Sequence, residues 1–199
     1  MSTPLATARA LARRRSAVRS RELESAGVAR AQISRLVAAG ELVRLARGLY
    51  ALPGQSPAAE DGLLRVARRA PDARLCLLTA LRLHGMTTQA PFEVWVAIGN
   101  KDRAPRLDWP PLRVVRFSGE ALDAGVTTLK TNGVPMRVTN VAKTVADCFK
   151  FRHLVGLDVA LEALREALRT RRIHSDELWR YAKICRVTRV MRPYLEALA

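Results

Sequence analysis

The sequence has few acidic residues, few cysteines and no long hydrophobic run. Its 199 residues include 34 Lys and Arg against 18 Asp and Glu, which gives a formal net charge of +16. A chain this basic gathers polyanions, so nucleic acid is the leading class of partner. Nearly all of the excess is arginine, whose guanidinium suits phosphates and guanine edges. A GC-rich genome also enriches arginine, so composition alone does not decide the partner.

The cysteines and the hydrophobic runs exclude two further classes. Three cysteines, an odd number, lie far apart among apolar neighbours, which predicts buried thiols in a reducing cytoplasm and no disulfide framework or metal site: Cys76, Cys148 and Cys185. The longest apolar run, Leu75 to Leu83, is interrupted by Arg82 and is too short to span a bilayer. The arginine-rich start resembles a transit peptide, but Pro4 opens an amphipathic stretch that we interpret as a first core helix.

Familiar catalytic motifs are missing as well. The sequence has no nucleophile elbow, no Walker A loop and no zinc motif, and its three histidines are scattered. Lys143 and Asp147 stand at i and i+4 and could form a catalytic pair, but an exposed ion pair on a helix is the simpler interpretation. We therefore predict no catalytic residue, no metal and no cofactor.

Two domains are predicted, at residues 1–53 and 58–199, because the segment Pro53-Gly-Gln-Ser-Pro57 has the composition of a linker. The first domain contains ten Arg and three Glu, a net charge of +7 in about fifty residues.

The first domain has the pattern of a winged helix-turn-helix. Ser20 can cap a short helix through Ala26, and Gly27 can supply a turn with positive φ. A second helix then carries its apolar residues inward and stops at Gly40: Ile33, Leu36 and Val37. Two β-prone segments follow, 41–44 and 48–51, and predict a two-stranded wing.

Duplex DNA is the predicted ligand of this domain. With Ile33 inward, Arg35 faces outward and can bind guanine, while Gln32 on the flank can pair with adenine. Arg30 suits a phosphate beside the helix N-terminus, and the wing arginines suit the minor groove or phosphates. The predicted contacts are Arg19, Ser20, Arg21, Arg30, Gln32, Ser34, Arg35, Arg44 and Arg47. The alternative is a small helical domain with a solvated basic face.

The rest of the chain predicts a mixed α/β domain with a helical C-terminal third, so the fold class is α+β. Strands are expected at 92–98, 112–117, 126–131 and 134–138, and helices at 58–70, 75–84, 140–151, 157–168, 175–184 and 189–198. Asn132-Gly133 is the strongest hairpin turn, and Thr139 or Asn140 can cap the helix that follows. Pro135 would place its strand at an edge or a bulge.

Several segments resemble the AbiEi antitoxins of type IV toxin-antitoxin systems. The segment Arg21-Glu-Leu-Glu-Ser-Ala-Gly-Val-Ala-Arg30, with Leu36-Val-Ala-Ala-Gly-Glu-Leu-Val-Arg44 and Leu45-Ala-Arg-Gly-Leu-Tyr50, is similar to their winged helix-turn-helix. Leu78-Thr-Ala-Leu-Arg-Leu-His-Gly85 and Val138-Thr-Asn-Val-Ala-Lys-Thr-Val-Ala-Asp147 resemble two later segments of the family, with Lys143 in place of the usual Arg.

The resemblance implies a cytoplasmic, nucleoid-associated bacterial protein. Its first domain would repress its own operon at an operator, and its second would counter a nucleotidyltransferase-like toxin with or without a stable complex. A helix-turn-helix that reads inverted repeats usually pairs up, but the sequence has no dimerisation heptads, so monomers that bind successive repeats are an equal alternative. The alternatives are an antitoxin that modifies its toxin by phosphoryl transfer, a nucleic-acid-processing enzyme, and an RNA-binding accessory protein.

Overall fold

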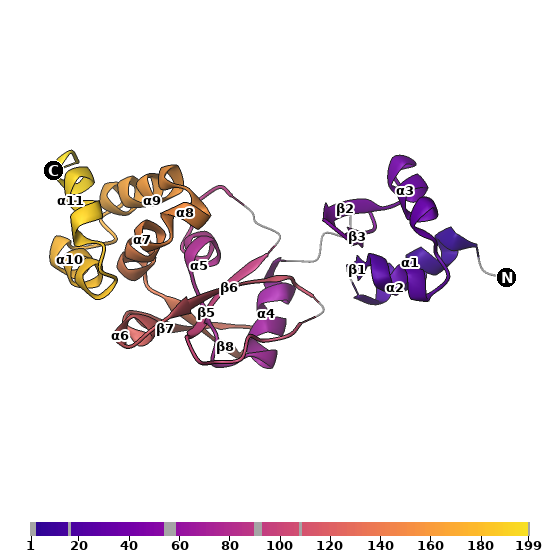
Figure 1. Ribbon diagram of the computed structural model, residues 1–199, viewed down its shortest axis with the longest axis horizontal. Helices are drawn as coiled ribbons and strands as arrows, with labels where there is room; N and C mark the ends of the chain where they lie inside the picture. The colour runs from indigo at the N-terminus through magenta and orange to yellow at the C-terminus, as the bar shows by residue number, and fades with distance from the viewer. Residues whose placement is uncertain (1–2, 16, 54–58, 90–92, 108, 199) are drawn as a thin grey trace. The chain divides into compact units, whose positions relative to one another are not determined.

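The computed structural model describes residues 3–15, 17–53, 59–89, 93–107 and 109–198. The chain divides into two compact units, residues 1–62 and 63–199 (Figure 1). The predicted linker residues 54–57 lie outside the described ranges, so the exact domain boundary stays a prediction. Each unit is described below by itself.

The first unit is a winged helix-turn-helix, as predicted. Its elements are α1 (Pro4–Arg15), β1 (Val18–Arg19), α2 (Ser20–Ser25), α3 (Arg30–Ala38), β2 (Val43–Ala46) and β3 (Leu49–Ala51). One buried cluster joins the three helices and the segment before the wing, and it consists of Ala8, Ala12, Val18, Leu23, Val28, Ile33 and Leu42. The expected first core helix is therefore present, and its small alanines allow the helices to approach closely.

Two details of this unit differ from the prediction. The wing sheet has three strands in the order β1-β3-β2, because Val18 and Arg19 pair with Tyr50 and Leu49. Ser20 is not the N-cap of α2; that residue is Arg19. The Ser20 hydroxyl donates instead to the Gly48 carbonyl oxygen at 3.3 Å, so it ties α2 to the wing turn.

Among its described residues the second unit has five strands, seven whole helices and most of α4, which begins four residues before the division. The strands are β4 (Arg74–Leu75), β5 (Val94–Gly99), β6 (Leu112–Phe117), β7 (Val126–Thr131) and β8 (Val134–Thr139). The helices are α4 (Ala59–Arg69), α5 (Leu77–Leu83), α6 (Glu120–Asp123), α7 (Val141–Lys150), α8 (Arg152–Val155), α9 (Leu157–Arg169), α10 (Ser175–Ile184) and α11 (Thr188–Glu196). The predicted α+β class and the helical C-terminal third are confirmed.

Helices cover both faces of the second unit's mixed sheet, whose strand order is β6-β5-β4-β8-β7 (Figure 1). The side chains of β5 alternate between the two covered faces. Trp95 and Ala97 join the cluster formed by α5, α7 and α9–α11. Val94, Val96 and Ile98 point the other way, into a cluster that includes Val66 of α4. A strand buried on both faces is apolar throughout, as this one is.

Two strand predictions need correction. Residues 74–75 form β4, so the helix expected from residue 75 begins at Leu77. β8 is an inner strand of the sheet, and not the edge strand that Pro135 suggested. Proline is tolerated there because β4 pairs with β8 only at Leu75 and Val138, three residues further along, while Pro135 sits opposite Lys130 of β7.

Candidate nucleic-acid interface

The helix-turn-helix is formed by α2, the turn at residues 26–29 and α3. Gly27 has φ +87°, the left-handed conformation that a residue with a side chain rarely adopts. The Val28 amide then donates to the Leu23 carbonyl oxygen at 2.9 Å and closes the turn. Because Leu23, Val28 and Ile33 are all buried, the register of α3 is fixed and its opposite face is presented to solvent.

The outward face of α3 contains four exposed residues, Ala31, Ser34, Arg35 and Ala38. Its small residues allow the backbone to approach a base pair, and Arg35 extends beyond them with donors suited to guanine. The exposure of Ser34 and Arg35 agrees with the predicted orientation.

Arg30, the first residue of α3, is exposed and forms an ion pair. Its Nε donates to Glu24 Oε1 at 2.7 Å, and the Arg30 side chain remains 85% exposed. The hydrogen bond and the charge of Glu24 raise the pKa of Arg30. Sequence reasoning missed this contact because the two residues are six positions apart, in different helices, where no helical spacing relates them.

Gln32 has a structural role that the prediction did not include. Its Oε1 accepts a hydrogen bond from the Ala29 backbone N–H at 3.0 Å, so the side chain folds back over the start of α3. Gln32 thus makes one half of a capping box, the bond to the N-cap amide, while the Ala29 methyl cannot accept the reciprocal hydrogen bond. The sequence did carry a signal for this role, because Gln or Glu three residues after an N-cap is typical of a capping box.

The remaining predicted contacts lie around β1 and the wing. Arg19 and Ser20 are half-buried, whereas Arg21, Arg44 and Arg47 are exposed. The β2–β3 register shifts between Arg44 and Ala46 at a bulge, which increases the local twist of the hairpin. Arg47 lies at the turn between the strands.

The second unit contains the other candidate pair, Lys143 and Asp147, and the structure corrects its environment. Lys143 Nζ lies 2.6 and 2.7 Å from the two Asp147 carboxylate oxygens, and the side chains are 1% and 0% exposed. The pair is therefore buried and not an exposed helix ion pair. The difference arises because α7 is enclosed by α5, α9 and α10, which the i,i+4 spacing could not reveal.

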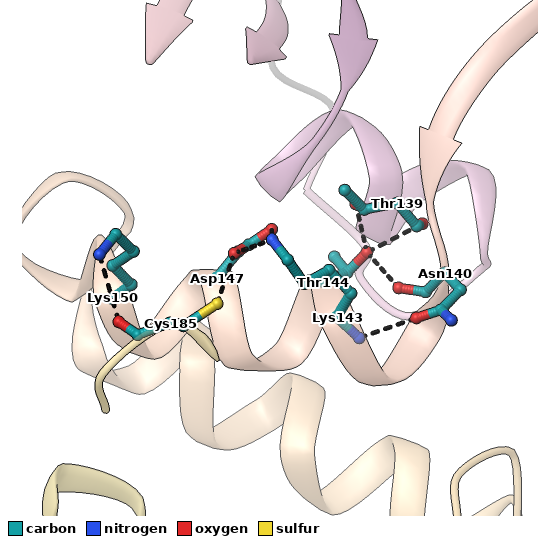
Figure 2. A network of polar contacts seen from close by, with 7 residues as sticks. All are labelled: Thr139, Asn140, Lys143, Thr144, Asp147, Lys150 and Cys185. Carbon is teal, nitrogen blue, oxygen red and sulfur yellow. Dashed lines mark hydrogen bonds and ion pairs between the residues drawn. The ribbon is translucent and has the colours of Figure 1, made fainter. Parts of the chain in front are cut away.

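Neighbouring groups extend the pair into a polar network along α7 (Figure 2). The Cys185 thiol donates to Asp147 Oδ1 at 3.3 Å, and Lys150 Nζ donates to the Cys185 carbonyl oxygen at 3.2 Å. Lys143 Nζ also lies over the Phe117 ring, 4.6 Å from its centroid, in a cation–π contact. At the other end of the helix, Asn140 Oδ1 accepts from the Lys143 amide, which confirms Asn140 as the cap.

The electrostatics of this network suit a structural role. Burial raises the pKa of Asp147, and the Lys143 ammonium opposes that shift. Burial also raises the pKa of Cys185 to about 12 and that of Cys76 and Cys148 well above the ordinary value, so these buried free thiols are poor nucleophiles. Every buried side-chain nitrogen and oxygen of the described residues has a hydrogen-bond partner.

Two features are missing from the described part of the chain. There, no group of three or more His, Cys, Asp and Glu side chains is arranged to hold a metal ion. No helix in that part combines the length and apolarity needed to cross a membrane.

Comparison with known proteins gives a family match and similar solved structures, one of which is described here. Residues 7–53 match the family model described as "Transcriptional regulator, AbiEi antitoxin", which confirms the resemblance predicted for the DNA-binding domain. The crystal structure of the RV2827C protein from Mycobacterium tuberculosis is similar over 87% of this chain and 69% of that one, with 20% identity and a TM-score of 0.47. No curated protein sequence matches the chain.

Proposed function

We propose, from the match of residues 7–53 to the AbiEi antitoxin regulators, that the chain represses its own operon and counteracts a nucleotidyltransferase-like toxin. The proposal assigns DNA recognition to the first unit and toxin antagonism to the second. It describes a binding protein and regulator, without catalysis by the chain itself.

The outward face of α3 is the observation that carries the proposal. Ser34 and Arg35 are exposed between Ala31 and Ala38, on a helix whose buried side is fixed by Ile33. A helix of this kind places its polar side chains against base edges when it enters the major groove. Arg35 would read guanine, and Arg30 would contact a phosphate or a base at the helix start.

The wing supplies a second set of contacts. Arg44 and Arg47 are exposed on β2 and at its turn, and arginines on a wing suit the minor groove or the adjacent phosphates. Next to this turn lie the N-cap of α2, Arg19, and its first two residues, Ser20 and Arg21. The Ser20 amide donates to the Gly48 carbonyl oxygen at 2.9 Å. Phosphate contacts at these residues would fix the register of α3 on the duplex.

The second unit gives the proposal its antitoxin part. A regulator that only bound DNA would need little beyond the first unit, whereas residues 63–199 form a separate compact unit with two hydrophobic clusters. A rigid folded domain of this size suits recognition of another protein. The toxin can be countered through a transient encounter as well as through a stable complex.

DNA binding by the full chain tests the proposal. The probe is the duplex upstream of the chain's own gene, with a scrambled duplex of equal length as competitor. Arg35→Ala should lower the ratio of specific to nonspecific affinity. The free-energy difference between the two modes of binding should shrink by about 1–3 kcal/mol, the value of one good base contact. Arg165→Ala on α9, which removes the same charge from an exposed position of the second unit, is the control and should leave that ratio unchanged.

Two outcomes contradict the assignment. Equal affinity of the unmodified protein for both duplexes would reject sequence-specific repression. An equal loss of affinity for both duplexes in Arg35→Ala would make Arg35 a phosphate contact only.

A further inference from the structure

The three glutamates of the winged helix-turn-helix, Glu22, Glu24 and Glu41, are all engaged within the fold. Glu22 Oε2 accepts from the Arg19 backbone N–H at 2.8 Å, and Glu41 Oε2 lies 2.6 Å from Arg9 Nη2. The partner of Glu24 is the guanidinium of Arg30, a residue of the proposed DNA interface.

The Glu24 contact uses only one edge of that guanidinium. Glu24 Oε1 accepts from Nε at 2.7 Å, and Nε lies on the side edge of the planar group. The end-on edge, made by the two terminal nitrogens, keeps the paired donors that bind a phosphate or a guanine in a bidentate manner. The Arg30 side chain is 85% exposed, against 33% for Glu24, so the carboxylate lies on the protein side of the pair.

Stability does not account for an acid at this position. An exposed ion pair contributes little to folding, since water screens it and two flexible side chains must be ordered. A negative charge beside a DNA-binding face also repels phosphates. Both arguments favour a role in which Glu24 orders the arginine before DNA arrives, because that ordering lowers the entropic cost of binding.

We propose that Glu24 is a positioning residue for DNA binding, holding the Arg30 side chain so that its two terminal nitrogens face an anionic or guanine acceptor. The inference rests on the proposed function and deepens it. Glu24 makes no contact with DNA in this arrangement, and it acts through Arg30.

Removal of Glu24 gives opposite results under the two interpretations. If the residue only repels phosphates, Glu24→Ala tightens binding, and it does so equally with or without Arg30. If it positions Arg30, Glu24→Ala weakens binding of the upstream duplex about threefold to tenfold, the range expected for releasing one side chain rich in rotamers. Glu24→Gln keeps an oxygen that can accept from Nε, so it should restore most of the affinity.

The experiment is a double-mutant cycle in the full chain. Affinity for the upstream duplex is measured for the parent, Glu24→Ala, Arg30→Ala and the double variant, and the double variant should bind no more weakly than Arg30→Ala. Glu41→Ala is the control, because it removes the same charge from another ion pair, with Arg9, and should not weaken binding. Thermal unfolding of each variant detects any loss of folded protein, and Glu24→Gln supports the role if it binds and unfolds like the parent.

If the parent binds the duplex and Glu24→Ala binds it equally well or more tightly, the role of Glu24 is overturned and DNA recognition is left intact. A further loss of affinity when Glu24→Ala is added to Arg30→Ala also overturns it, since the effect then does not pass through Arg30. A parent that binds neither duplex rejects the proposed function and this inference with it.

Discussion

Lys143 and Asp147 form a buried ion pair one helical turn apart on α7, with Nζ 2.6 and 2.7 Å from the two carboxylate oxygens. Two charges are costly to remove from water, and the contact offsets that cost only while both partners are present. Phe117 lies against the Lys143 ammonium, and the Cys185 thiol donates to the Asp147 carboxylate. The pair therefore couples α7 to β6 and to the end of α10.

Loss of either partner should be strongly destabilising. Lys143→Met leaves the Asp147 carboxylate buried without its cation, and Asp147→Asn leaves the ammonium without its anion. Each change should lower the free energy of unfolding by about 3–5 kcal/mol, measured by denaturant titration. This expectation replaces the near-zero effect that an exposed pair would have given.

The double variant Lys143→Met with Asp147→Leu separates charge from packing. Replacement of both charges by apolar side chains of similar size should recover most of the stability, to within about 1–2 kcal/mol of the parent. If the single variants unfold like the parent, the pair is not buried in solution. A double variant no more stable than either single one would point to a packing defect instead.

His84 should make stability depend on pH. Its Nε2 lies 2.7 Å from the Thr139 carbonyl oxygen, and burial lowers its pKa below the ordinary value of 6.5. The unfolded chain then takes up a proton more readily than the folded one. The contribution of neutral His84 to the free energy of unfolding is complete above pH 6.5. It is lost as the pH falls toward the lowered pKa of His84 in the folded chain.

Unfolding at about pH 7.5 and about pH 5.5 measures this effect. His84→Gln keeps a side-chain donor for Thr139 but does not titrate, so it should reduce the difference in stability between the two conditions. His153→Gln, at an exposed position, should leave the difference as it is in the parent. An unchanged difference in His84→Gln would assign the pH dependence to other groups.

Gly125 should not tolerate a side chain. Its φ is +66°, and a Cβ there would lie 2.8 Å from Lys143 Cβ and 2.9 Å from the Tyr181 ring. Gly125→Ala combines backbone strain with overpacking, so it should cost about 2–5 kcal/mol of stability. Gly133→Ala, with φ +76° and nothing within 4 Å, should show the strain alone, about 1–2 kcal/mol. A similar loss of stability in both variants would mean that the side chains around Gly125 rearrange to accommodate the methyl group.

The two units should separate in function. Residues 1–53 should bind the upstream duplex without relieving the toxin, and residues 58–199 should relieve the toxin without repressing the promoter. Growth with the toxin under an independent promoter, together with a reporter for repression, measures both activities. Rescue of growth by residues 1–53 alone would contradict this division of labour.

Local features of the sequence determined most of the first unit. Gly27 marks the turn because only a residue without a side chain adopts its φ of +87° at little cost. Ile33 follows at the spacing that puts it inside, and Arg35 is consequently outside. In the second unit, Asn132-Gly133 joins β7 to β8 and Asn140 caps α7, again through interactions between near neighbours in the chain.

The tertiary structure alone decided the features that depend on distant residues. β1 and β4 have two residues each, too few for a periodic pattern, and they exist because β3, β5 and β8 supply their hydrogen bonds. Burial of Lys143 depends on the helices that enclose α7, and the Glu24–Arg30 pair depends on how the turn brings α2 and α3 together. Sequence spacing carries information about neighbours within one element, whereas burial and pairing between elements are set by the packing of the whole unit.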